Sequence, residues 1–416
     1  MKILLAHNFY QQPGGEDVVF EQERQLLQRG GHTVVTYQRS NREADSYSGV
    51  KRLQLAARTI WSEDTRREFS RLLHKEQPDI VHVHNTFMIL SPSIFSACHE
   101  AGIPVVKTLH NYRLYCPAAT FFRDGHVCED CVDKNLACGI FHGCYRGSRA
   151  ATATVALELS VHRWRHTWTR DIDCYIALTQ FARSRFLRAG LPNDRVFVKP
   201  NFVYPDPGRK KNREGSYALF VGRLSEERLR TLLSAWSVLR TAQIPLLIVG
   251  GGPQLEKFRQ QATDTGLNEV AFLGHVSREK AVAAMQSARF LVFPSEWYEN
   301  FPVTIAESFA SSVPVICSRI GAMQEIVEDG QTGLTFEPGN PGDLAAKVEW
   351  AWSHPQQLSK MAETARREFE TKYSAEQAYP MLMDIYRYAM QRRADNGCVV
   401  QGEKGKFAHA AAAGSR

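Results

Sequence analysis

The sequence lacks any long apolar run, and this absence excludes several classes of protein. No stretch of the 416 residues approaches the roughly 18 consecutive apolar residues that a membrane-spanning helix needs. The opening residues, Met1 to His7, contain an apolar run too short for a secretory signal peptide. We therefore predict a cytoplasmic protein, in which the nine cysteines do not form structural disulfides.

A strong charge bias is absent as well. The chain has 51 basic and 44 acidic residues, for a net charge of +7. This mild excess suits a phosphate-bearing substrate or an anionic membrane surface, and by itself it does not indicate a nucleic-acid partner. The hydrophobic share of 44% and the charged share of 23% are ordinary for a globular protein. The length exceeds one typical core and predicts two domains.

Short apolar runs rich in Val and Ile alternate with amphipathic stretches along both halves of the chain. Such runs predict strands of a buried parallel sheet, and the stretches between them predict helices. The expected strands are 3–6, 33–37, 80–83, 105–109, 175–178 and 196–198, then 218–221, 246–249, 271–273, 290–293 and 315–317. This alternation predicts the α/β class, with two Rossmann-like, doubly wound domains.

The domain boundaries follow from breaks in this alternation. We expect an N-terminal domain over 1–200, a proline-rich and basic linker over 201–216, and a C-terminal domain over 217–372. A helix over 373–392 is expected to return to the N-terminal domain, and a Gly- and Ala-rich tail over 393–416 is expected to be disordered. A cleft between two such domains is a natural ligand site, because strand ends and helix N-termini converge there.

Two carboxylates of the second half, Glu299 and Glu307, are separated by seven residues. Pro302 between them suits the opening turn of a helix, which would place Glu299 in the preceding loop and Glu307 inside the helix. The helix N-terminus offers unpaired N–H groups to an anion. The two carboxylates would then accept hydroxyl hydrogen bonds on either side of a diphosphate. The spacing alone is equally consistent with solvated surface carboxylates.

The segment Glu299-Asn300-Phe301-Pro302-Val303 through Glu307, followed by 314–316, resembles the E-x7-E signature of retaining glycosyltransferases of family 4. Other segments resemble the family in the expected order, namely 220–225, 248–253, 272–276 and 329–334. The resemblance covers the chain from about Lys2 to Tyr388. It implies the GT-B fold, in which two Rossmann-like domains face each other across a cleft.

The resemblance also implies a binding site for a nucleotide-sugar donor. Glu299 would bind sugar hydroxyls, Glu307 the ribose and Arg223 the diphosphate, whose oxygens suit the planar fork of arginine. The family has a Lys-Gly pair after this arginine, and here Arg228 is the expected substitute for the lysine. The further residues expected around the donor are Gly14, Gly15, Gly250, Val276, Asn300, Phe301, Pro302 and Val303.

Two features of the first half complete the expected site. Gly14-Gly15 precedes a helix, and such a turn lets backbone N–H groups approach a phosphate, although a plain tight turn would look the same. The turn lacks the G-x-G-x-x-G pattern, so a nicotinamide cofactor is not expected. His110 ends an expected strand where the family has a histidine beside the reacting sugar, and His84 ends another strand at the same sheet edge. Each could also be an ordinary structural histidine.

The chemistry that the resemblance implies is transfer with retention through an oxocarbenium-like state, while negative charge builds on the departing diphosphate. The catalytic residues would be His110, Glu299 and Arg223. Arg223, Arg228 and helix N-termini would stabilise the leaving group, so no catalytic metal or other catalytic cofactor is expected. The donor would be a UDP- or GDP-sugar, and the acceptor a glycan or a lipid-linked molecule of surface polysaccharide or lipopolysaccharide biosynthesis.

Five cysteines fall within one loop-rich region, and Cys128-Glu129-Asp130-Cys131 forms a C-x2-C pair. Such a cluster favours a structural zinc site, while reduced buried thiols and an iron–sulfur cluster are the alternatives. The favoured ligands are Cys116, Cys128, Cys131 and Cys144, with Cys138, His126 or His142 as substitutes. Some family 4 members resemble this segment, so 113–147 is interpreted as an insert in the N-terminal domain.

Basic segments with tryptophan suggest contact with an anionic membrane, although a solvated helix face explains them equally well. One is the segment 163–170, and the other contains Arg52, Arg58, Arg66, Arg67 and Arg71. Two other functions stay open at this point. One is a sugar-nucleotide epimerase of GT-B fold. The other is a non-catalytic sugar-nucleotide-binding protein, because the segment after Arg223 is one residue shorter than in the family.

Overall fold

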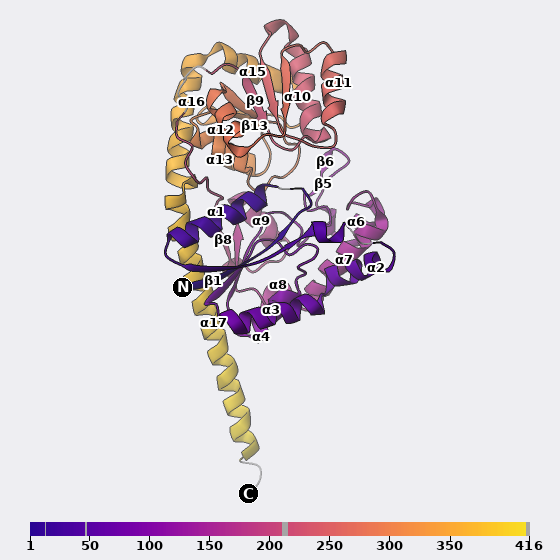
Figure 1. Cartoon of the computed structure of the whole chain (residues 1–416), viewed down its shortest axis with the longest axis vertical. Helices are drawn as coiled ribbons and strands as arrows, with labels where there is room; N and C mark the ends of the chain where they lie inside the picture. Colours follow the sequence, from indigo (N-terminus) through magenta and orange to yellow (C-terminus); the bar gives the residue numbers. More distant parts are fainter. Residues whose placement is uncertain (13, 46–47, 210–214, 413–416) are drawn as a thin grey trace.

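The computed structural model describes residues 1–12, 14–45, 48–209 and 215–412, without the side chains of 50–53 and 396–412. It contains one six-stranded sheet in each half of the chain (Figure 1). The strand orders are β2-β1-β3-β4-β7-β8 and β11-β10-β9-β12-β13-β14. Every pairing within the two sheets is parallel. The predicted pair of doubly wound α/β domains is confirmed.

The first sheet forms from the apolar runs that the sequence predicts. Its strands are β1 (Lys2–Phe9), β2 (Thr33–Ser40), β3 (Ile80–Val83), β4 (Val105–Thr108), β7 (Cys174–Ala177) and β8 (Val196–Val198). Alternate side chains enter the cores on its two faces, as Leu5 and Leu4 do on β1. The flanking helices include α1 (Gly15–Arg29), α3 (Glu63–Glu76), α4 (Ser93–Glu100) and α9 (Gln180–Arg188).

The second sheet has one strand that the sequence analysis missed. Its strands are β9 (Ala218–Val221), β10 (Leu246–Val249), β11 (Val270–Gly274), β12 (Phe290–Phe293), β13 (Val315–Ser318) and β14 (Gly333–Phe336). β14 is short and begins at a glycine, which hid it among turn residues. The glycine is needed, because a methyl group on Gly333 would lie 1.9 Å from the carbonyl oxygen of Val315. The helices are α10 (Glu226–Val238), α11 (Leu255–Asp264), α12 (Arg278–Ser287), α13 (Val303–Ala310), α14 (Ala322–Ile326), α15 (Pro341–Ser353) and α16 (Pro355–Glu368).

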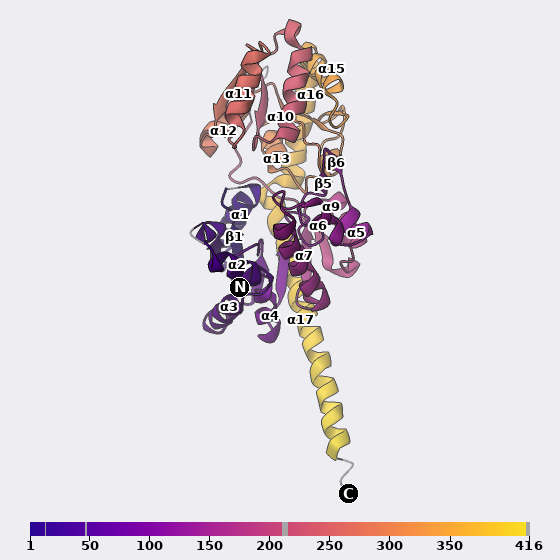
Figure 2. The same cartoon turned by 90° about the vertical axis from the view of Figure 1, so that its right-hand side faces the viewer.

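Helix α17 (Ala375–Ala412) leaves the second domain and runs along the first (Figure 1). Its Arg393 pairs with Asp173 at 2.8 Å. The sequence predicted a disordered tail from 393, but the helix continues to Ala412 and projects beyond the first domain (Figure 2). Alanine, which is frequent near the end of this segment, has the highest helix propensity of all residues.

The linker is held at its start. Val203 donates its N–H to the carbonyl of Tyr373 at 3.0 Å, and Asp206 pairs with Arg366 at 2.6 Å. The basic run at 210–214 and the side chain of Arg52 lie outside the described residues. Of the helices in the described part of the chain, none combines the length and apolar character that crossing a membrane requires.

The cysteine-rich segment folds between β4 and β7. It contains a hairpin of β5 (Phe122–Arg123) and β6 (His126–Val127), then α5 (Asp130–Asp133) and α6 (Ala137–His142). The helices α7 (Arg149–Trp164) and α8 (Thr167–Arg170) follow, and α7 packs against α6 and against α2 (Val50–Ile60). The hairpin points toward the second domain in both views (Figures 1 and 2).

Candidate active site

Three predicted donor-binding elements meet where the two domains face each other. Gly14 and Gly15 form the start of α1, Arg223 follows β9, and Val303 begins α13. A methyl group on Gly14 would lie 4.0 Å from Nη2 of Arg223, and one on Gly15 would lie 3.9 Å from a methyl of Val303. The N-termini of α1 and α13 and a guanidinium therefore lie close together. Unpaired N–H groups and an arginine fork are a suitable environment for a diphosphate.

Glu299 lies in the loop between β12 and α13, as predicted. Its carboxylate accepts hydrogen bonds from the Arg228 guanidinium and from Ser295 Oγ, the latter at 2.8 Å. The Arg228 guanidinium also lies 4.5 Å above the ring of Trp297. Both members of the pair are mostly buried, with 12% of the Arg228 side chain and 16% of the Glu299 side chain exposed. Arg228, the expected substitute for the family's lysine, therefore pairs with Glu299, the carboxylate that was expected to bind the sugar.

Glu307 lies on α13 and is only loosely paired. Its nearest cation is Nη2 of Arg278 at 3.9 Å. Burial raises the pKa of Glu307, and Arg278 partly opposes this rise. Pro302, expected in the opening turn of this helix, is its N-cap residue.

The other residues that were predicted to bind the nucleotide-sugar donor differ in what they contact. Asn300 connects the domains, since its side chain donates to the carbonyl of Leu109 at 3.3 Å and its carbonyl accepts from Thr179 at 3.3 Å. Phe301 is buried, with its ring 5.4 Å from that of Tyr373. Val276 packs against the core.

Gly250 shapes the turn that supports Arg223. Its φ of +145° favours glycine, and a methyl group there would lie 1.9 Å from the carbonyl oxygen of Gly222. The turn after β10 therefore packs directly against the residue that precedes Arg223. A role in local backbone approach accounts for this glycine without any contact to a ligand.

His110 follows the inner strand β4, at the carboxyl ends of the strands of the first sheet. Its Nε2 lies 3.0 Å from Nδ1 of His84, which follows the neighbouring strand β3. Burial lowers the pKa of both imidazoles well below the ordinary value, and neighbouring histidines lower it further. The two rings are therefore neutral near pH 7. The contact between Asn300 and Leu109 brings the Glu299 loop beside His110.

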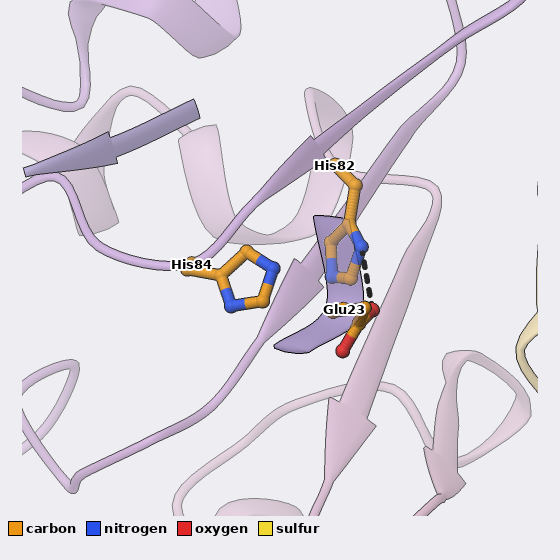
Figure 3. Close-up of side chains that lie close together, drawn as sticks. All are labelled: Glu23, His82 and His84. Carbon is orange, nitrogen blue, oxygen red and sulfur yellow. Dashed lines mark ion pairs between the residues drawn. The ribbon is translucent and has the colours of Figure 1, made fainter. Parts of the chain in front are cut away.

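A buried polar network lies behind this histidine pair (Figure 3). His82 stands beside His84 with ring centroids 4.5 Å apart, and its Nδ1 lies 3.1 Å from a carboxylate oxygen of Glu23. Lys199 lies 3.5 Å from Glu23. Burial acts to raise the pKa of Glu23, but Lys199 and His82 outweigh it and lower the pKa to about 2.

The group Glu23, His82 and His84 has ligand atoms within 4.8 Å of one another, the spacing of a metal site. Both nitrogens of His82 are already engaged, with the hydroxyls of Tyr386 and Thr108 at 2.8 Å each. Lys199 supplies the cation for Glu23. We therefore interpret the group as a hydrogen-bonded network. Of its members the sequence analysis named His84 alone, and the alternation His82-Val83-His84 on one strand is the signal that could have indicated His82.

A narrow cavity of about 30 Å³ is lined by both His84 and His110. Its lining includes Lys107 and Glu158. Burial raises the pKa of Glu158 to about 8 and lowers that of Lys107 to about 8. Burial also raises the pKa of nearby Glu16 to about 8. The volume admits about one or two water molecules.

Four of the five clustered cysteines share one neighbourhood. A methyl group on Gly139 would lie 3.2 Å from Sγ of Cys131 and 3.1 Å from Pro117, the neighbour of Cys116. The carbonyl of Gly139 accepts the N–H of Cys144 at 3.1 Å. Burial raises the pKa of Cys131 to about 12, and the thiols of Cys116, Cys144 and Cys128 add to this. Within the described residues, no three of these sulfur atoms lie within 4.8 Å of one another. The proposed substitutes His126 and His142 are exposed.

The cysteine-rich segment also contacts the second domain, which the sequence did not indicate. The ring of Phe122 in β5 lies 6.0 Å from that of Trp297, the residue beneath Arg228. Glu129 fastens the segment to α9 through Arg185 at 3.2 Å and Arg188 at 2.7 Å. The insert therefore supports the loop that carries Glu299.

The two basic stretches differ in their pairing. Arg58, Arg66 and Arg67 each pair with a carboxylate of α3, at 2.5, 2.8 and 2.9 Å. In the other stretch, Arg163 lies over the ring of Tyr115 and Arg165 over that of Trp61. Arg170, at the end of this stretch, pairs with Asp171 at 2.7 Å.

Two family models match the chain and together cover both domains. One, described as Glycosyltransferase Family 4, matches residues 13–207, and the other, described as Glycosyl transferases group 1, matches residues 206–368.

Two curated relatives match over part of their length. The chain is 32% identical over 196 residues to D-rhamnosyltransferase WbpZ of Pseudomonas aeruginosa, a match of 46% of this chain and 50% of the relative. It is 27% identical over 181 residues to O-antigen chain mannosyltransferase C of Escherichia coli, a match of 43% of this chain and 48% of the relative. The chain thus spans about half the length of these relatives.

Two solved structures share the arrangement of both domains. A glycosyltransferase from Rickettsia africae superposes with a TM-score of 0.68 at 16% identity, over 94% of this chain and 98% of that one. Anabaena Alr3699/HepE, solved in complex with UDP and glucose, superposes with a TM-score of 0.63 at 17% identity, over 92% and 98%. These likenesses confirm the expected GT-B fold.

Proposed function

The chain belongs to glycosyltransferase family 4, and from this premise we propose that it transfers a sugar from a nucleotide-sugar donor to an acceptor hydroxyl with retention of configuration. The observation that carries the proposal is the close approach of Gly14 to Arg223 and of Gly15 to Val303, which join the two domains. Two helix N-termini and a guanidinium that lie together in this way suit a diphosphate.

The proposed roles follow from the pairing in the structure. The Arg228–Glu299 pair holds two groups that a donor would separate, with Arg228 turning to the diphosphate and Glu299 to sugar hydroxyls. Glu307, which has only a loose partner, would accept from the ribose. His110 would contact the reacting sugar.

The proposed reaction takes place on one face of the sugar. The acceptor oxygen bonds to the anomeric carbon as the bond to the diphosphate breaks, and the departing phosphate oxygen takes the acceptor proton. Arg223 and Arg228 stabilise the charge that develops on the leaving group, which is the role assigned to electrophilic groups in such transfers. In this proposal the arginines make a catalytic metal unnecessary.

The substrates are the least constrained part of the proposal. The complex of HepE with UDP and glucose supports a UDP-sugar donor, with a GDP-sugar as the other option. The name of the O-antigen chain mannosyltransferase supports an acceptor of surface polysaccharide or lipopolysaccharide assembly, either glycan or lipid-linked. Our proposal places this reaction in the cytoplasm, at the cytoplasmic face of the inner membrane.

Membrane contact is proposed through α7, which lies against α2 and α6 on the first domain (Figure 2). Leu157 and Trp164 are two helical turns apart on α7, with exposed fractions of 53% and 79%. Arg149 and Arg163 on the same helix are exposed. An apolar stripe flanked by arginines suits the surface of an anionic bilayer.

We also keep a structural zinc ion as a proposal for the insert. Cysteine thiolates are suitable zinc ligands, and Gly139 gathers three of the four candidates. Cys116, Cys128, Cys131 and Cys144 would hold the ion and fix the hairpin that contacts Trp297. Binding of the ion would require the sulfur atoms to approach one another.

The test of the proposed function is a panel of sugar nucleotides read by thermal shift, followed by product analysis with the best donor. We expect one donor to raise the Tm and to yield a glycosylated product only when an acceptor is present. A new sugar nucleotide formed without acceptor would replace the proposal by an epimerase. Donor binding with neither transfer nor hydrolysis would indicate a non-catalytic binding protein.

A further inference from the structure

The hydrogen bond between His84 and His110 joins two neutral rings. Its single proton is therefore covalently bound to only one of the two rings. Either Nε2–H of His110 donates to Nδ1 of His84, or Nδ1–H of His84 donates to Nε2 of His110. The alternatives differ in what they leave on the far nitrogen of each ring. Which nitrogen carries a proton is set by the bond that the other nitrogen makes.

The surroundings of His84 distinguish the alternatives. Its Nε2 is buried and has no hydrogen-bond partner among the residues that the structure describes. If His84 accepted at Nδ1, its other proton would sit on Nε2 as a buried N–H without an acceptor. Buried N–H groups without a partner are rarer than unpartnered acceptors, because the lone pair of an acceptor is less costly to bury. His82 cannot accept this N–H, since both of its nitrogens already form hydrogen bonds.

We propose that His84 is a positioning residue that donates its Nδ1–H to His110 and thereby holds His110 in the tautomer with a proton on Nδ1. His110 then presents Nδ1–H as a hydrogen-bond donor to an oxygen of the donor sugar. This part rests on the proposed function, whereas the tautomer itself does not. His110 is partly exposed, while His84 is 2% exposed.

The network behind His84 fixes its ring. His82 packs on His84 and is in turn held by Thr108 and by Tyr386 of α17. Because α17 comes from the second domain, the histidine pair is anchored by both halves of the chain. The charged and titratable groups that face the pair are His7 from β1, Asp17 and Glu23 from α1, His82 from β3, Lys107 from β4, Lys199 after β8 and Tyr386 from α17.

Removal of the donor at position 84 should change which nitrogen of His110 carries the proton. A proton on Nδ1 of His84 keeps Nε2 of His110 unprotonated, because Nε2 must accept that hydrogen bond. The substitution His84→Leu removes this donor, so the neutral ring of His110 can carry its proton on either nitrogen, while burial keeps the ring uncharged. His84→Asn is the matched control, because the asparagine side-chain N–H lies near the place of the histidine Nδ1–H.

The first measurement is the 15N spectrum of histidine-labelled protein between pH 6 and 8, with His110 assigned by loss of its signals in His110→Gln. We expect a neutral His110 ring with the proton on Nδ1 in the wild type and in His84→Asn. In His84→Leu we expect a mixture of the two neutral tautomers, in which part of His110 carries its proton on Nε2. A wild-type His110 that is protonated on Nε2, or on both nitrogens, overturns the proposal whether or not the protein is a transferase.

The second measurement is the pH profile of kcat and of the donor KM for the three proteins. We expect kcat of His84→Leu to fall by about tenfold relative to wild type between pH 6 and 8, with a smaller change in the donor KM, because the Nδ1–H donor of His110 is no longer held in place. His84→Asn should follow the wild-type profile. A uniform loss at every pH in both variants would mean a merely structural role for His84 and would overturn the proposal. Absence of transfer in the wild type refutes the proposed function and leaves the spectral test of the tautomer in force.

Discussion

The ring of Phe122, in the hairpin of the first domain, lies 6.0 Å from the ring of Trp297, in the loop of the second domain that carries Glu299. Trp297 supports the guanidinium of Arg228, whose partner is Glu299. A chain of contacts therefore joins the cysteine-rich insert to the proposed donor site. The two domains meet at this point through side chains and not only through the linker and α17.

We expect Phe122→Ala to weaken donor binding without unfolding the protein. Loss of the ring removes an aromatic contact worth about 1 kcal/mol, which corresponds to about a fivefold rise in the donor KM. Donor titration by calorimetry and steady-state kinetics measure this change. Phe141→Ala is the control, because Phe141 also belongs to the insert but is exposed. Equal affinities for wild type and Phe122→Ala would show that the insert does not support the donor loop.

Glu299→Gln and His110→Ala should each lower kcat by a factor of about 100 or more, because the proposed function assigns each group to the reacting sugar. Glu299→Gln keeps the size of the side chain and can still accept from Arg228, so the fold should be retained. Circular dichroism and Tm check that retention. Glu363→Gln on α16 is the matched control, because Glu363 is exposed and is not one of the candidate site residues. Transfer at wild-type rates by both site variants would contradict the assigned site.

The buried carboxyl of Glu158 predicts a pH-dependent stability. Burial raises its pKa to about 8 in the folded state, above the ordinary value of 4.5, so the folded protein binds more protons between these values. The contribution of Glu158 to the stability therefore falls as the pH rises from about 4.5 to about 8. Glu16 contributes with the same sign, since burial raises its pKa to about 8 as well.

The substitution Glu158→Gln removes one of these two contributions. We expect it to stabilise the protein by about 1–3 kcal/mol at pH 8, and by less at pH 5. Chemical denaturation at both pH values gives the two differences in unfolding free energy. A stability difference that does not grow with pH would mean that the carboxyl of Glu158 is ionised without cost in the folded state.

The zinc proposal predicts about one zinc ion per folded chain, measured by elemental analysis of protein purified without a metal-binding tag. Cys128→Ser and Cys131→Ser should lose the ion and lower the Tm, while Cys98→Ser, a buried cysteine of α4, should retain it. Chelation should lower the Tm of the wild type and of Cys98→Ser, but not that of the two variants without the ion. Zinc below about one-tenth per well-folded chain would show that the thiols are simply reduced and buried.

Much of the architecture followed from apolar periodicity, since strands such as β3 and β12 are continuous buried runs that only a parallel sheet explains. The strand β14 and the helical continuation of α17 did not follow. The strand β14 begins with a glycine that close packing against Val315 requires, and glycine is also typical of turns. The continuation of α17 is rich in Gly and Ala, a composition that also suits disorder. For the site, sequence placed Arg223, Glu299 and His110 near strand ends. It could not show that Arg228 faces Glu299 or that Phe122 reaches Trp297, because such contacts join residues far apart in the chain.

Membrane association through α7 gives the last prediction. Wild-type protein should sediment with vesicles that contain anionic phospholipid at low salt, and less so at high salt, because arginine–lipid attraction is screened. Trp164→Ala and Arg163→Glu should each weaken binding by about fivefold or more, since the first removes apolar area and the second reverses a charge. Val238→Ala on α10 is the control, because Val238 is exposed but lies on the second domain. Wild-type protein that stays unbound at low salt, or variants that bind as it does, would mean that α7 is an ordinary solvated helix and that an acceptor must reach the cleft from solution.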